Sequence, residues 1–161
     1  MKNLLRFLRF LALGAWVGSI IYFVAVVTRG AFAVLTRDQA GALVGFTLSG
    51  LHQLGIITAI VFLIATIGLR KSLSALASPA ALGVVLMLLL TLASQQIVIP
   101  RMDTLRREMV SVDAAPSSDP RRAEFDRLHR VSVDLEAAVL LLGLVSLFLT
   151  AREPTSRHSR D

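Results

Sequence analysis

Few side chains in this chain could take part in chemistry, and they recur beside long apolar stretches. They carry imidazole, amide, hydroxyl, guanidinium and carboxylate groups, which can bind a polar ligand, move a proton or hold a metal ion. Cysteine is absent from the sequence, so thiolate metal sites, disulfides and cysteine nucleophiles are excluded. The candidate ligand-binding residues are His52, Gln53, Gln95, Gln96, Arg101, His129, Ser132, Asp134 and Glu136.

Helical spacing places part of this set on one face. Ser132 and Glu136 follow His129 at intervals of three and four residues, so we expect the three side chains on one side of a helix. A carboxylate on the inward face of a membrane helix needs a partner, which favours a functional role for Glu136. The alternative is that these groups lie in the interface and form interhelical hydrogen bonds that hold the helices together.

Four apolar stretches must position these residues. Hydrophobic residues make up 55% of the 161 residues and the mean hydropathy is +0.70, and roughly 20 apolar residues are enough to cross a bilayer core. We therefore expect an all-α integral membrane protein, an up-and-down bundle of four transmembrane helices with the third and fourth extending beyond the membrane. The predicted bundle covers 1–152, with spans at about 8–28, 50–69, 80–100 and 130–150, and a short polar tail at 153–161.

Two segments are predicted to be helical outside the spans. The segment 38–50 is mildly apolar and rich in glycine, and it either extends the second span or lies in the interface. As one helix, 37–69 would measure roughly 50 Å, longer than a bilayer core, so we expect a bend near Gly45 or Gly50. The segment 101–130 is expected to carry the third and fourth helices beyond the membrane around a loop.

The polar candidates are predicted to form one layer at one end of the bundle. The strictly apolar part of the fourth span is 137–151, roughly 22 Å of helix, which is shorter than a core of about 30 Å. The fourth span must therefore draw Glu136 to the membrane boundary or below it, and the second and third spans draw in His52 and Gln95 in the same way. Because successive helices alternate in direction, these residues fall at the same end. The opposite end of the spans is expected to be apolar.

The distribution of charge bears on partners and location. The formal net charge is +6, and the basic residues flank apolar runs, where they contact lipid headgroups. We therefore expect the lipid bilayer as the partner and no binding of nucleic acid. An even number of spans puts both termini on one side, where basic residues lie close to the span ends with few acids nearby. This favours a bacterial inner-membrane protein with both termini in the cytoplasm.

Two pairs of glycines have the spacing that lets helix backbones approach closely. Gly14 and Gly18 form one pair, and Gly41 and Gly45 form the other. We expect both pairs to serve packing within the chain. The alternative is that one of them is the contact of a homo-oligomer.

Motifs along most of the chain, from about 10 to 150, match a known pattern of membrane domains. The more specific motifs are Pro100-Arg101 with Leu105-Arg106, and Phe125-x-x-Leu-His129-x-x-Ser132. On these motifs the sequence resembles the transmembrane-protein-205-like family, the membrane domain of unknown function numbered 4149. The resemblance implies a four-helix membrane domain with no established reaction. Its typical polar positions in this chain are His52, Gln96, Arg101, His129 and Ser132.

Several functions fit these residues. The first is a non-enzymatic bundle that binds a ligand, a solute or a partner in a polar pocket at one membrane face. The second is haem b or a divalent transition metal held by His52 and His129, with Glu136 as a third metal ligand. A structural or accessory membrane subunit is a further alternative, and an enzyme with His129 and Glu136 as acid–base groups is another. The sequence shows no recognisable nucleophile motif or phosphate loop, so we expect binding without catalysis.

Overall fold

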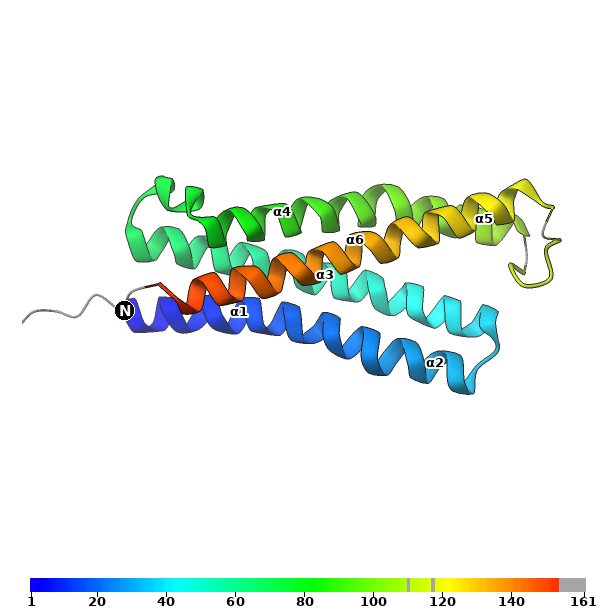
Figure 1. The fold of residues 1–161 in the computed structure, drawn as a ribbon, viewed down its shortest axis with the longest axis horizontal. Helices are drawn as coiled ribbons and strands as arrows, with labels where there is room; N and C mark the ends of the chain where they lie inside the picture. The colour runs from blue at the N-terminus through cyan, green and yellow to red at the C-terminus, as the bar shows by residue number, and fades with distance from the viewer. Residues whose placement is uncertain (110, 117, 154–161) are drawn as a thin grey trace, which may run out of the picture.

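Four long helices run side by side and alternate in direction, as the sequence predicted (Figure 1). The computed structural model describes residues 1–109, 111–116 and 118–153. The first long helix consists of α1, η1 and α2, and the third consists of α4, η3 and α5. The bounds are α1 Lys2–Tyr22, η1 Phe23–Thr28, α2 Arg29–Val34, α3 Arg37–Arg70, η2 Leu73–Ala77, α4 Pro79–Ala93, η3 Ser94–Val98, α5 Ile99–Met109 and α6 Pro120–Ala151.

Each long helix exceeds the thickness of a bilayer core. The four helices contain 33, 34, 31 and 32 residues, or roughly 47–51 Å at 1.5 Å per residue, against a core of about 30 Å. Each contains an apolar stretch long enough to cross a membrane, so the chain is an all-α integral membrane protein. The predicted extension of the third and fourth helices is present, and the first two helices extend in the same direction (Figure 1).

The second long helix, α3, is one uninterrupted α-helix, so the segment 38–50 extends the second span. The helix continues without a break through Gly45 and Gly50, where the sequence predicted a bend. A side chain of α5 supports this part of α3. The guanidinium of Arg106 lies against two glycines, with Nη2 3.3 Å from the place that a Cβ on Gly41 would take and Nη1 3.5 Å from that on Gly45. The Gly41/Gly45 pair therefore packs within the chain.

The ends of the helices follow from local sequence. The side chain of Thr36 accepts a hydrogen bond from the backbone N–H of Gln39, and the side chain of Gln39 accepts one from the backbone of Thr36. This capping box begins α3. Lys71 ends α3 in the left-handed conformation, with a φ of 52°. Asp119 caps α6 ahead of Pro120, and both residue types suit a helix start.

Close packing in the middle of the bundle depends on glycines. A Cβ added to Gly55 of α3 would lie 2.5 Å from the indole Nε1 of Trp16, and one added to Gly143 of α6 would lie 2.6 Å from the side chain of Val17. The first long helix therefore contacts both α3 and α6 at close range. The side chains around these contacts form a closely packed apolar core, and its large, fully buried side chains include Leu13, Trp16, Ile20, Phe62, Val84 and Met87.

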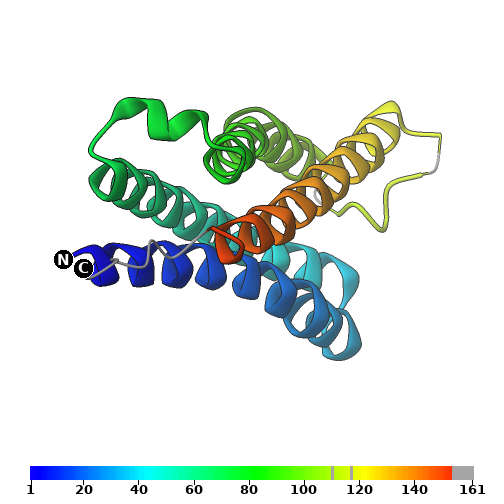
Figure 2. The same ribbon diagram turned by 60° about the vertical axis from the view of Figure 1, so that its left-hand side comes forward.

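An ion pair between Arg9 and Glu153 lies at the end of the bundle where α1 begins. The sequence predicted an apolar end here, and this ion pair corrects that prediction. Arg9 donates two hydrogen bonds to Glu153, from Nη1 to Oε2 at 2.7 Å and from Nη2 to Oε1 at 2.8 Å. The same guanidinium lies over the ring of Phe62, 4.9 Å from its centroid. Glu153 falls in the segment expected to be a polar tail, yet it joins the end of α6 to α1 (Figure 2).

Candidate functional site

Three polar side chains from three helices meet inside the bundle. His52 of α3 is 1% exposed, and its Nδ1 lies 2.9 Å from Oε1 of Gln95. Its Nε2 lies 3.2 Å from Oε2 of Glu136 on α6, whose side chain is 12% exposed. We call these three residues the polar cluster. They are three of the nine residues that the sequence singled out.

The local backbone explains how Gln95 reaches the polar cluster. Gln95 lies in η3, a π-helical turn between α4 and α5. A π-turn contains one more residue than an α-turn, so it changes the direction of the side chains that it carries. Pro100 has no backbone N–H with which to close an α-turn behind it, which is a local cause of the wider turn. Gln95 is half-buried beside His52, whereas Gln96 is exposed.

On two of its three helices, the polar cluster lies far from any charged residue. On the third long helix, the first charged residue after Gln95 is Arg101, six residues or about 9 Å further along the axis. On α3, His52 is 14 residues or about 21 Å from Asp38. The nearest charged residues on these two helices are therefore well removed from the cluster, and the carboxyl group of the cluster is that of Glu136.

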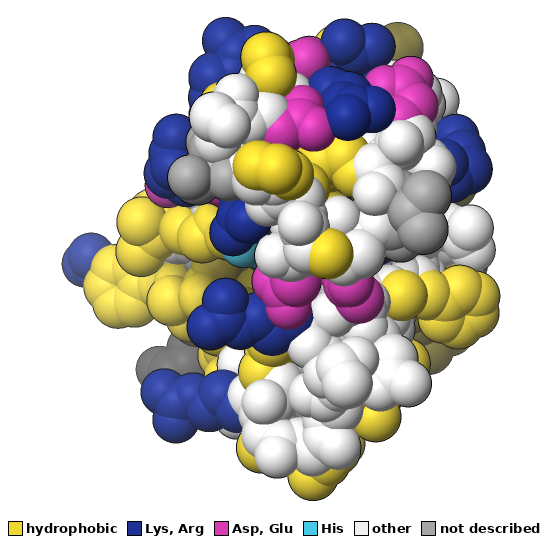
Figure 3. All heavy atoms as spheres, turned by 90° about the vertical axis from the view of Figure 1, so that its right-hand side faces the viewer, with side chains coloured by type: hydrophobic (Ala, Val, Ile, Leu, Met, Phe, Trp, Pro, Cys, Tyr) yellow, Lys and Arg dark blue, Asp and Glu magenta, His cyan; other side chains and the backbone are white. Residues whose placement is uncertain are grey.

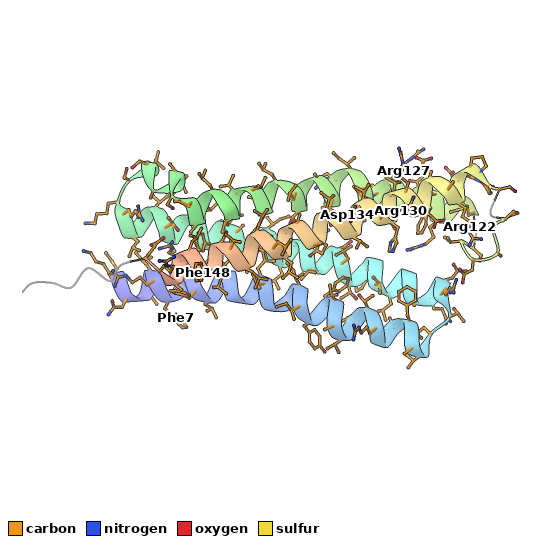
Figure 4. All side chains as sticks on the ribbon, viewed as in Figure 1. Phe7, Arg122, Arg127, Arg130, Asp134 and Phe148 are labelled. Atoms are coloured by element: carbon orange, nitrogen blue, oxygen red, sulfur yellow. The ribbon has the colours of Figure 1, made fainter. Side chains whose placement is uncertain are left out.

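The other predicted site residues do not join the polar cluster. Ser132 is buried one helical turn before Glu136. Arg101 is exposed and pairs with Glu124, with Nε 3.0 Å from Oε1. Asp134 lies exposed on α6 (Figure 4). The remaining exposed members of the predicted set are Gln53, Gln96 and His129.

Of the three residues named for a metal or a haem, His52 and Glu136 are in contact, whereas His129 does not join them. His129 is exposed on α6, seven residues or about 10 Å from Glu136. Both ring nitrogens of His52 already face partners. Within 1–109, 111–116 and 118–153, no group of three or more His, Cys, Asp or Glu side chains could hold a metal ion.

A groove of about 770 Å³ opens between the first long helix and α3, on a side of α3 different from His52. We call it the lateral groove. No atom lies within 4 Å of the place that a Cβ on Gly14 or Gly18 would take, so this glycine pair borders open space instead of the close helix contact that the sequence predicted. The lining of the lateral groove is mostly apolar and includes Gly14, Gly18, Ser19, Tyr22, Gly50 and Gln53.

The end of the bundle beyond the polar cluster carries acids and bases intermingled over its surface (Figure 3). Asp38 accepts hydrogen bonds from the hydroxyl of Ser111 and from the backbone N–H of Val112, which ties the start of α3 to the segment after α5. The guanidinium of Arg106 lies 5.5 Å from the centroid of the Phe125 ring. The sequence did not identify these contacts, because they join residues far apart in the chain.

The fold and its interior define a small integral membrane protein of four helices, with a buried His–Gln–Glu cluster and an open groove beside it. The chain belongs to the family described as Domain of unknown function (DUF4149), whose model matches residues 11–111. The matched region contains His52 and Gln95 and ends before α6. Comparisons with curated proteins and with solved structures found no match.

Proposed function

We propose that this chain is a non-enzymatic membrane protein that binds an amphipathic, lipid-like molecule in the lateral groove. The groove itself carries the proposal: its volume of about 770 Å³ lies within the usual range of ligand sites, which is about 300–1,000 Å³. Its small residues leave room for an acyl chain, and Ser19 and Gln53 offer hydrogen-bonding groups along its wall. A molecule dissolved in the bilayer would reach the groove sideways.

Packing elsewhere in the bundle favours binding over conduction. Between the polar cluster and the Arg9–Glu153 pair, the interior is filled by Trp16, Phe62 and Met87, each at most 1% exposed. These three large, fully buried side chains occupy the interior where an ion or a polar solute would have to pass. Both ring nitrogens of His52 face partners within the polar cluster, Gln95 and Glu136, so we propose no catalytic role for this imidazole.

Filling the groove tests the proposal. Replacing Gly18→Leu adds a side chain where nothing lies within 4 Å of the new Cβ, so the fold is kept while the groove is occupied. Trp16 is the only tryptophan, and its ring is buried against Gly55, between the two helices that border the groove, so its fluorescence reports on brominated lipid bound between them. We expect the apparent affinity for a brominated phospholipid to fall about tenfold or more, equivalent to about 1.4 kcal/mol.

Gly30→Leu is the matched control, because Gly30 also has nothing within 4 Å and does not line the groove. It should leave quenching of Trp16 unchanged. Equal quenching in the wild type and Gly18→Leu would contradict the proposal. A changed oligomeric state with unchanged quenching would also contradict it, and would instead indicate a contact between two copies of the chain.

The orientation in the membrane is a second part of the proposal. We propose that the chain lies in a bacterial inner membrane with both termini in the cytoplasm. Lys2, Arg6, Arg70 and Lys71 support this placement, since they follow or precede the spans directly at the end where α1 begins.

A further inference from the structure

The polar cluster contains an acid and a base in direct contact within the apolar part of the bundle. His52 and Glu136 belong to different helices and are 1% and 12% exposed, the latter figure for the side chain alone. We propose that His52 and Glu136 together form a proton-binding site inside the membrane, with Gln95 fixing the state of the imidazole. The proposal is independent of the lateral groove.

The hydrogen bonds of His52 determine how many protons the site holds. Oε1 of Gln95 can only accept, so the Nδ1 that faces it at 2.9 Å carries a hydrogen. Nε2 and Oε2 of Glu136 face each other at 3.2 Å, and both are acceptors when deprotonated. One proton must therefore lie between them. It belongs either to an imidazolium beside a carboxylate or to a carboxylic acid beside a neutral imidazole, and the pair is neutral in both cases.

Neutrality suits the position of the site. An isolated charge inside a membrane is costly, whereas a neutral pair joined by a hydrogen bond is tolerated. The elements around His52 bring no further charge to it: the first long helix has no charged residue from Phe10 to Thr28, and the third has none from Pro79 to Pro100. On α6, Asp134 is exposed, and on the first long helix the titratable Tyr22 is exposed as well.

Two hydroxyl groups without partners lie on the core face of the helix that carries Gln95. Oγ1 of Thr91 and Oγ of Ser94 are buried and form no hydrogen bond. The helices α4 and α6 run antiparallel, and Gly143 of α6 lies against the side chain of Met87 on α4. Moving forward along α4 therefore corresponds to moving backward along α6. Thr91 comes level with Val139, and Ser94 comes level with Glu136. These hydroxyls can accept or donate hydrogen bonds beside a mobile proton.

Loss of the bridging proton has a mechanical consequence. Nε2 of His52 and Oε2 of Glu136 would then face each other as two lone-pair acceptors, and the contact between α3 and α6 would become repulsive. Retention of the proton therefore preserves the contact between His52 and Glu136, and its release weakens that contact.

The test follows both groups of the pair in the full-length protein in lipid nanodiscs. The ring nitrogens of ¹⁵N-labelled histidine are observed by NMR and the carboxyl groups by infrared spectroscopy as pH is raised. The His52 signals are assigned by their loss in His52→Gln and their persistence in His129→Gln. We expect Nε2 of His52 and the carboxyl of Glu136 to change in one common protonation step.

Variants of two neighbouring acids on α6, Glu136 and Asp134, give the decisive comparison. Glu136→Gln removes the carboxylate that shares the bridging proton with His52, so the joint protonation step of the wild type should be lost and the Nε2 signal of His52 should no longer follow it. Asp134→Asn removes an exposed acid two residues away and should leave that step in place. An unmoved His52 step in Glu136→Gln would overturn the proposal. If that variant does not fold, the wild-type spectra decide: a joint step supports the site, and two independent steps overturn it.

Discussion

At the residue scale, the contact between Gly55 and Trp16 sets how closely the first long helix approaches α3. We predict that Gly55→Ala destabilises the protein by about 1–3 kcal/mol, because the added methyl group would lie 2.5 Å from the indole and force the helices or the ring to move. Thermal unfolding in detergent, followed by the fluorescence of the single tryptophan, measures the change.

Gly30→Ala is the control for this substitution. It places the same methyl group on the first long helix where nothing lies within 4 Å, and alanine favours a helix over glycine by about 1 kcal/mol. Equal loss of stability in both variants would show that the effect comes from the loss of glycine in general and not from the Trp16 contact.

The sequence predicted which polar residues lie near one level and did not predict which way each one faces. His52 is buried and the adjacent Gln53 is exposed, and Gln95 and Gln96 differ in the same way. Neighbouring residues on a helix point about 100° apart, and in helices that are apolar all round no polar stripe shows which side is inward. The sequence placed His129 on one face with Ser132 and Glu136, yet His129 is exposed whereas Ser132 is buried.

At the scale of elements, the Arg9–Glu153 pair fixes the end of α6 to the start of the first long helix. We predict that Glu153→Gln destabilises the protein by about 3 kcal/mol, because it leaves the buried guanidinium of Arg9 without its counterion. Arg70→Gln is the control: Arg70 is half exposed and 3.9 Å from Glu153, so its loss should cost less than about 1 kcal/mol. Similar losses in the two variants would contradict a specific role for Arg9.

The same pair predicts how stability depends on pH. The hydrogen bonds from Arg9 lower the pKa of Glu153 below its ordinary value of 4.5, and the charges of Arg9 and Arg70 act in the same direction. A lowered pKa in the folded protein means that the stabilisation is fully present above the ordinary pKa and is lost as pH falls toward the folded value. Unfolding midpoints of the wild type should therefore fall in acid more steeply than those of Glu153→Gln. Parallel curves would contradict the prediction.

Sequence alone could not assign the helix ends that these contacts depend on. Hydropathy indicated the second span at 50–69 and left open whether the helical segment 38–50 extends it. The helix α3 does begin at Arg37, because a helix continues beyond its apolar span where its outer turns find packing. Arg106 supplies that packing at Gly41 and Gly45, and it lies more than 60 residues further along the chain. Glu153 was assigned to a tail for a similar reason: its partner Arg9 is 144 residues away.

At the scale of the whole molecule, hydropathy was enough to predict the number of helices and their alternation, since each span is a separate apolar run. It was not enough to predict the interior. The bundle is polar at both ends, with the polar cluster toward one and the Arg9–Glu153 pair at the other, and the apolar core closes the space between them.

The orientation of the bundle yields a prediction on the same scale. The sequence has no cysteine, so a single introduced cysteine is the only thiol in the protein. Ser74, between α3 and α4, and Ser118, between α5 and α6, are both exposed and lie at opposite ends of the bundle.

With both termini in the cytoplasm, a membrane-impermeant maleimide added to intact spheroplasts should label Ser118→Cys and should label Ser74→Cys only after lysis. The reverse pattern would place the termini outside, because reagent access depends on the side of the membrane and both sites are free to react. Labelling of both variants in intact spheroplasts would contradict a single orientation.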